Sequence, residues 1–225
     1  MTFVLVILTA AIILAVELSR KSRKTNTVST AELIDQHPYS YEIIDRYYHP
    51  GHTWATVSST HKVTIGVDDF TTQMIGEVDR AELPEQGQTI HQGEPFAVLH
   101  RQGRSITEVA PVSGRVIDVN RRLKHHPGAL ADSPFGSGWI AKIIPTNLEK
   151  DLRNLLKGTV AEGWRETVRM QLIQRMAPNV GTVMQDGGQI VPNLADHLTE
   201  EEWNYLVKEF FPIVLSSHTQ NNTTN

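Results

Sequence analysis

The chain reads Ala110-Pro111-Val112-Ser113-Gly114-Arg115-Val116-Ile117-Asp118-Val119 near its middle, where a turn precedes a strand. Proline presets the φ angle of a turn and glycine tolerates a positive φ, so we expect a tight turn up to Gly114. The β-branched residues that follow are typical of a strand. Just upstream, Leu99 and Ile106 are expected to flank a hairpin whose tip is residues 100–105. These features indicate a β protein with short strands joined by tight turns.

The same alternation of strands and turns continues on both sides of this stretch. Residues 63–67 and 96–99 are β-branched or apolar runs, which are typical of strands. Residues 83–87 and 91–95 contain the proline and glycine of tight turns. Many short strands at such close spacing predict a sandwiched or closed all-β body.

Several segments occur in an order and at spacings that are specific only when taken together. They are His52-Thr53-Trp54, Val63-Thr64-Ile65-Gly66-Val67-Asp68-Asp69-Phe70, Ile75-Gly76-Glu77-Val78, Glu82-Leu83-Pro84, Ala110-Pro111-Val112-Ser113-Gly114 and Asp132-Ser133-Pro134-Phe135-Gly136-Ser137-Gly138-Trp139-Ile140-Ala141-Lys142-Ile143. With these segments, residues 52–158 resemble the H protein of the glycine cleavage system. The resemblance implies a fold that is mainly β with α additions, the barrel-sandwich hybrid of lipoyl domains and H proteins.

In that family one lysine carries lipoate in an amide bond, at the hairpin tip before the Ala-Pro-Val-Ser-Gly segment. The matching position in this chain is Gly103, and no lysine occurs between Lys62 and Lys124. The family also tends to place a glutamate three residues earlier, where this chain has His100. The neighbouring arginines are poor acceptors, because a guanidinium stays protonated. We therefore expect neither lipoate at this tip nor any other cofactor.

The tip itself has two interpretations. Gln102 and Gly103 suit a simple hairpin turn with glycine at positive φ, in a domain whose function has been lost or moved. Alternatively, the basic tip formed by His100, Arg101, Gln102 and Arg104 docks an acidic partner or an anionic group, as clustered arginines can. The sequence leaves both interpretations open.

The start of the chain predicts a membrane anchor. Residues 2–16 carry no charge, and about fifteen to seventeen helical residues rise roughly 23–26 Å, close to the roughly 30 Å hydrocarbon core. The missing basic segment before this run and the missing cleavage site after it disfavour a secretory signal. The basic residues after the run place the body on the cytoplasmic side of the inner membrane, where they can contact anionic headgroups. These residues are Arg20, Lys21, Arg23 and Lys24.

The end of the chain predicts an αβ extension of the body. Five apolar residues recur every four positions before Pro178, and Asp186-Gly187 suits a hairpin. Thr199-Glu200-Glu201-Glu202 is a capping box, and it opens a helix with one apolar face. The predicted helical stripe is Val160, Trp164, Val168, Leu172 and Met176, and the apolar face of the last helix is Trp203, Leu206, Val207, Phe210 and Phe211.

These patterns divide the chain into five parts. We expect a transmembrane anchor in residues 1–19, a basic flank and linker in 20–45, and the H-protein-like domain in 46–158. An αβ extension in 159–215 and a disordered tail in 216–225 complete the chain.

Composition and motifs exclude several classes of function. The chain has no cysteine, so it has no disulfide, thiolate metal site or cysteine nucleophile. A net charge of −4 gives no electrostatic footprint for nucleic acid. His125-His126 lacks the helical spacing of a metal site, and Asp68-Asp69 suits a helix cap better than acid–base catalysis. With no nucleophile motif and no phosphate-binding loop, we expect no enzyme acting alone.

The function that follows is a membrane-anchored, non-lipoylated interaction or scaffold module. Its partners would be the membrane and proteins such as glycine-cleavage-like or lipoate-linked enzymes. One alternative is the family role, a lipoyl carrier of the aminomethyl group in glycine decarboxylation, with attachment at an unexpected lysine such as Lys62, Lys124 or Lys142. The other is a binding module for lipoate or another small acid near the basic tip.

Overall fold

The structure is a computed structural model that describes residues 45–59, 61–176, 184–185, 189–190 and 193–211. The anchor predicted in residues 2–16, its basic flank and the predicted tail lie outside these residues. Within the described ranges, no helix is both long and apolar enough to cross a membrane.

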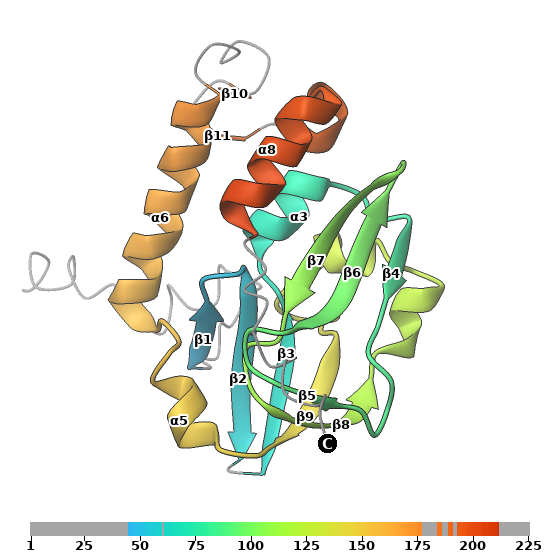
Figure 1. The fold of residues 1–225 in the computed structure, drawn as a ribbon, viewed down its shortest axis with the longest axis vertical. Helices are drawn as coiled ribbons and strands as arrows, with labels where there is room; N and C mark the ends of the chain where they lie inside the picture. The colour runs from blue at the N-terminus through green and yellow to red at the C-terminus, as the bar shows by residue number, and fades with distance from the viewer. Residues whose placement is uncertain (1–44, 60, 177–183, 186–188, 191–192, 212–225) are drawn as a thin grey trace, which may run out of the picture. The chain divides into compact units, whose positions relative to one another are not determined.

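Two antiparallel sheets form the body (Figure 1). The larger sheet has the strand order β1-β2-β3-β9-β8-β5, and the smaller one has the order β4-β6-β7. The larger sheet consists of β1 (Arg46–His49), β2 (Thr53–Ser59), β3 (Lys62–Val67), β9 (Ala141–Pro145), β8 (Gly114–Val119) and β5 (Thr89–Ile90). The smaller sheet consists of β4 (Arg80–Glu82), β6 (Pro95–Arg101) and β7 (Arg104–Val109).

Helices and one small hairpin complete the described chain. Before the extension these are α3 (Asp69–Ile75), η1 (Arg121–Lys124), α4 (Ala129–Asp132) and α5 (Leu148–Leu152). The extension contains α6 (Gly158–Arg175), the strands β10 (Met184–Gln185) and β11 (Gln189–Ile190), η3 (Leu194–His197) and α8 (Glu200–Phe210).

One apolar core joins the sheets to the helices of the extension. Ile65 of β3, Leu99 of β6 and Ile106 of β7 are fully buried, and they belong to the same cluster as Leu172 of α6 and Leu206 of α8. Burial of this many apolar side chains supplies the main driving force for folding. The extension therefore shares the core of the body.

The start of β8 requires a glycine, because it lies close to the backbone of β9. A methyl group on Gly114 would press against the carbonyl oxygen of Ile144 and lie 2.9 Å from Cα of Pro145. Because these are backbone atoms of the paired strand β9, a larger residue would force the two strands apart. Close packing of β8 on β9 thus explains why glycine ends the Ala-Pro-Val-Ser segment.

The structure confirms the main expectations for the fold. The body is mainly β with added helices, and Leu99 pairs with Ile106 in the predicted hairpin. The capping box is present, because Thr199 and Glu202 cap the start of α8 reciprocally. Strands β10 and β11 form the hairpin predicted around Asp186.

One expectation for the helices was wrong in detail. Val160 was placed on the buried stripe of α6, yet it is 64% exposed, because the first turn of this helix has Ala161 rather than Val160 on its packed side.

Candidate functional site

The β6–β7 hairpin ends in a two-residue turn. Gln102 has φ 48° and Gly103 has φ 84°, and two positive φ angles are typical of the type I′ turn that joins twisted strands. The tip is shorter than residues 100–105, because Arg101 pairs with Arg104 and both belong to the strands. Nothing lies within 4 Å of where a Cβ of Gly103 would be. The position matching the family's lysine is therefore open to solvent and has no side chain.

Arg101 does not project from the tip but turns toward the extension. Its side chain is only 7% exposed, and its Nε and Nη2 donate to the two carboxylate oxygens of Asp196 at 3.1 and 2.5 Å. A third hydrogen bond, from Nη1 to the carbonyl oxygen of Glu77, measures 2.9 Å. This bidentate geometry is the strongest form of arginine–carboxylate pairing.

Arg104 also contacts the extension. Its Nη2 donates to the carbonyl oxygen of Leu198 at 2.5 Å, and its guanidinium lies 5.5 Å from the ring centre of Trp203. Both partners come from the segment that leads into α8 or from α8 itself, which lies beside the hairpin in Figure 1. The two arginines thus attach opposite strands of the hairpin to the extension.

Asn193 completes this contact. Its Oδ1 accepts hydrogen bonds from the backbone N–H of Glu77 at 3.1 Å and from Nη1 of Arg101 at 3.4 Å. Its backbone is left-handed, with φ 57°, a conformation that asparagine tolerates better than most residues. We call Asn193, Asp196, Leu198 and Trp203 the tip clamp.

His100 points elsewhere. Its Nε2 lies 3.0 Å from Oε1 of Glu82, which also accepts a hydrogen bond from Arg80. That hydrogen bond from Arg80 is the main reason why the pKa of the Glu82 carboxyl is lowered. His100 and Gln102 are therefore the parts of the basic tip that the clamp leaves unused.

The Arg101–Asp196 pair predicts a measurable coupling between hairpin and extension. Arg101→Ala and Asp196→Ala should each lower the free energy of unfolding by about 1–3 kcal/mol, because a guanidinium that cannot lose its proton stays buried when Asp196 is removed. A double-mutant cycle in urea should give a coupling energy of about 1 kcal/mol or more.

The matched control is the Arg153–Glu149 pair, whose side chains are 72% and 88% exposed. The same cycle should give about 0.5 kcal/mol or less there, because water screens exposed pairs. Equal coupling energies for the two pairs would contradict a structural role for the clamp.

A buried polar cluster lies at the start of α3. Nδ1 of His52 is 3.0 Å from Oδ2 of Asp68, and both side chains are almost fully buried. Asp68 also caps α3, because its Oδ1 accepts a hydrogen bond from the N–H of Thr71 at 3.0 Å. The His52 ring stacks on Phe70 and Trp164, with ring centres 4.2 and 5.1 Å apart. Asp68 therefore has the capping role predicted from the sequence.

Glu108 of β7 belongs to the same region. Its carboxyl is completely buried, and neither oxygen has a hydrogen-bond partner within the described residues. Burial, reinforced by the charge of nearby Asp68, raises the pKa of this carboxyl well above its ordinary value. The folded protein consequently holds a proton on Glu108 that the unfolded chain loses near pH 4.3, roughly the glutamate pKa in peptides.

This proton predicts a pH dependence of stability. Because the folded pKa is raised, the contribution of Glu108 is fully present below the unfolded pKa and is lost as the pH rises toward the folded pKa. The side chain of Glu108→Gln stays neutral at every pH. The free energy of unfolding of this variant, relative to the wild type, should therefore increase by up to about 1.4 kcal/mol per pH unit in that range.

Urea denaturation of both proteins from pH 4.5 to 8 measures this difference. Burial, and then the charge of His52, lower the pKa of His49 to about 4, so His49 makes stability rise with pH. Both proteins contain His49, and subtracting one stability curve from the other removes its contribution. A difference that does not change with pH would contradict a protonated Glu108.

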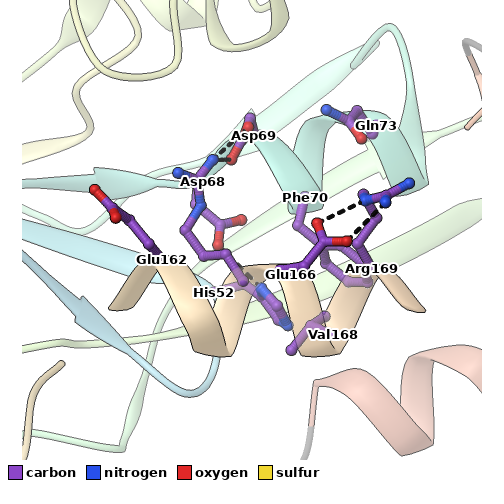
Figure 2. A pocket seen from close by; sticks show the side chains of 10 residues that line it. His52, Asp68, Asp69, Phe70, Gln73, Glu162, Glu166, Val168 and Arg169 are labelled. Atoms are coloured by element: carbon purple, nitrogen blue, oxygen red, sulfur yellow. Dashed lines mark hydrogen bonds and ion pairs between the residues drawn. The ribbon is translucent and has the colours of Figure 1, made fainter. Parts of the chain in front are cut away.

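A pocket of about 260 Å³ opens between α3 and α6 (Figure 2). Two ion pairs line it: Arg165 contacts both oxygens of Asp69 at 2.6 Å, and Arg169 contacts Glu166 at 2.8 and 2.9 Å. Within the described residues, no three metal-ligating side chains converge. The pocket carries no assembled chemistry, and the hairpin tip is therefore the stronger candidate site.

The sequence identified the hairpin but missed what contacts it. Gly103, Arg101 and Arg104 lie together at the tip, whereas the four basic residues of the predicted membrane flank lie outside the described chain. The tip clamp was missed, because Arg101 and Asp196 are 95 positions apart and no local pattern connects them. The burial of Glu108 could have been predicted, because it is two positions after Ile106 and so lies on the same buried face of β7.

Comparisons with known proteins agree on the family. Residues 46–167 match the family described as Glycine cleavage H-protein. A probable glycine cleavage system H protein of Pyrococcus abyssi is 39% identical over 111 residues, which is 49% of this chain and 81% of that protein. The glycine cleavage system H protein of Thermus thermophilus is 33% identical over 127 residues, 56% of this chain and 95% of that protein.

A solved structure agrees as well. The crystal structure of a glycine cleavage system H protein from Mycobacterium marinum superposes with a TM-score of 0.50 at 25% identity, and the match covers 55% of this chain and 98% of that one. The body is thus a domain of the lipoyl-carrier class in fold. The chain belongs to the glycine cleavage H-protein family. The family match ends at residue 167, so all four clamp residues lie beyond it.

Proposed function

We propose that this family member carries no lipoate on its hairpin and acts as a protein-interaction module. The observation that supports the proposal is the tip itself, where Gly103 offers no side chain to acylate and the clamp holds both flanking arginines. The position of Gly103 is open, so what is missing there is the amine that a lipoyl group needs, and the two flanking arginines are bound to the extension. The residues at the tip therefore do not fit a covalently bound lipoyl group.

A lipoyl-carrier role is the second candidate, and the relatives favour it. The proteins to which the chain is similar are described as glycine cleavage system H proteins. The role would require attachment away from the tip. Lys62 starts β3, Lys124 ends η1, and Lys142 of β9 donates to Asp118 at 2.7 Å, so none of the three is on the hairpin.

The basic tip gives less support to a binding module for lipoate or another small acid. The guanidinium groups of Arg101 and Arg104 already bond to Asp196 and to Leu198. An added carboxylate would have to displace partners that are fixed within the fold.

The membrane setting belongs to the same proposal. Residues 2–16 would anchor the chain as a single span, with the body on the cytoplasmic side and Arg20, Lys21, Arg23 and Lys24 at the headgroups. The module would then present its body to proteins near the inner membrane, such as glycine-cleavage-like or lipoate-linked enzymes. Catalysis would belong to those partners, because no assembled reactive group occurs among the residues that the structure describes.

The intact mass of the protein from its own host membranes tests this function. The expected mass equals that of the bare polypeptide, allowing for the initiating Met1. An H protein with a lipoyl lysine, purified from the same cells, is the control that shows attachment to be active there. A mass increased by one lipoyl group would restore the carrier role, and peptide mapping would then locate the modified lysine.

A further inference from the structure

Strand β7 has a free edge. The smaller sheet has the order β4-β6-β7, so among the described residues only β6 pairs with β7. The backbone N–H and C=O groups of an edge strand that point away from the sheet are free to pair with another extended chain. Such an edge is where proteins bind peptides by adding a strand.

The register shows which groups point outward. Arg101 and Arg104 close the two-residue turn, so in an antiparallel pair the next residues, His100 and Ser105, are not hydrogen-bonded to each other. In agreement, the carbonyl of His100 accepts from the N–H of Asp79, on the opposite side from β7. By the same alternation, the backbone groups of Ser105 and Thr107 face away from β6.

A groove of about 510 Å³ runs along this edge, and helix α8 forms its other wall. Val207, which is half-buried, and the small exposed parts of the core residues Trp203 and Phe211 supply an apolar side to it, and Glu200 lies at the helix start. Figure 1 shows α8 beside β7. The groove thus combines a backbone edge for hydrogen bonds with an apolar patch, centred on Val207, for side chains of an added strand.

The charges that line the groove indicate which side chains a bound segment would carry. Glu200 is exposed and lines the groove, whereas the one cation there, Arg104, already bonds to Leu198 and lies over Trp203. A basic side chain on the bound segment would therefore find an acidic group, and an acidic side chain would not find an available cation in this groove.

We propose that the groove between β7 and α8 binds an extended peptide segment of a partner protein, with alternating apolar residues and a basic residue beside Glu200. The segment adds to the free edge of β7 as a further strand. This inference rests on the proposed function, because it names the kind of partner that the interaction module takes.

The probe is the fluorescently labelled peptide acetyl-Lys-Val-Thr-Val-Thr-Lys-amide, titrated against the full-length chain in detergent micelles. Anisotropy should report saturable binding, and the amides of Ser105 and Thr107 should exchange with deuterium more slowly in the complex. The same peptide N-methylated on every second residue should bind about tenfold more weakly or worse, since it loses backbone donors.

Variants of the chain sharpen the test. Glu200→Gln should weaken binding about two- to fivefold, whereas Glu201→Gln, the matched control outside the groove lining, should not. Ser105→Pro should abolish binding without unfolding the protein, because the N–H that it removes points away from β6.

Several results would overturn the inference. These are no binding at millimolar peptide, equal binding of the N-methylated peptide, or binding without slower exchange at Ser105 and Thr107. Binding that appears only after removal of residues 212–225 would instead assign the groove to the chain's own end. A lipoylated intact mass would overturn the proposed function while leaving these binding results as they are, so the two failures are distinguishable.

Discussion

The ion pair between Arg101 and Asp196 is the constraint around which the hairpin and the extension are arranged. A guanidinium keeps its charge at all relevant pH values, so burying it is costly unless every donor finds an acceptor. Here two donors reach one carboxylate and a third reaches the carbonyl of Glu77. Because Asp196 belongs to the extension, this pairing holds the extension at the hairpin tip.

This arrangement separates the fold of the family from its chemistry. Two positive φ angles make the turn, and glycine satisfies that requirement at least as well as lysine. The lysine of a carrier is thus needed for attachment and not for folding, which is why an H-protein fold can persist with Gly103 at its tip. The relatives' names favour a carrier, whereas the tip and its clamp favour an interaction module.

Local sequence patterns predicted much of the fold, but they could not predict polar contacts between residues far apart in the sequence. The Leu99–Ile106 hairpin and the Thr199 capping box follow from residues close together in sequence, and both are present. The burial predicted for Val160 was wrong, because helical periodicity does not show where a helix extends beyond the core. Asp196 could not be assigned to Arg101, because charged residues carry no periodic signal for a partner 95 positions away.

The central claim is that the extension holds the hairpin in one position. Because the chain has no cysteine, Ser105→Cys and Tyr205→Cys place two spin labels on exposed sites of β7 and α8 without competing thiols. Pulsed EPR should give one narrow distance distribution, and Asp196→Ala should broaden it. A broad distribution in the protein with an intact clamp, unchanged by Asp196→Ala, would contradict the account.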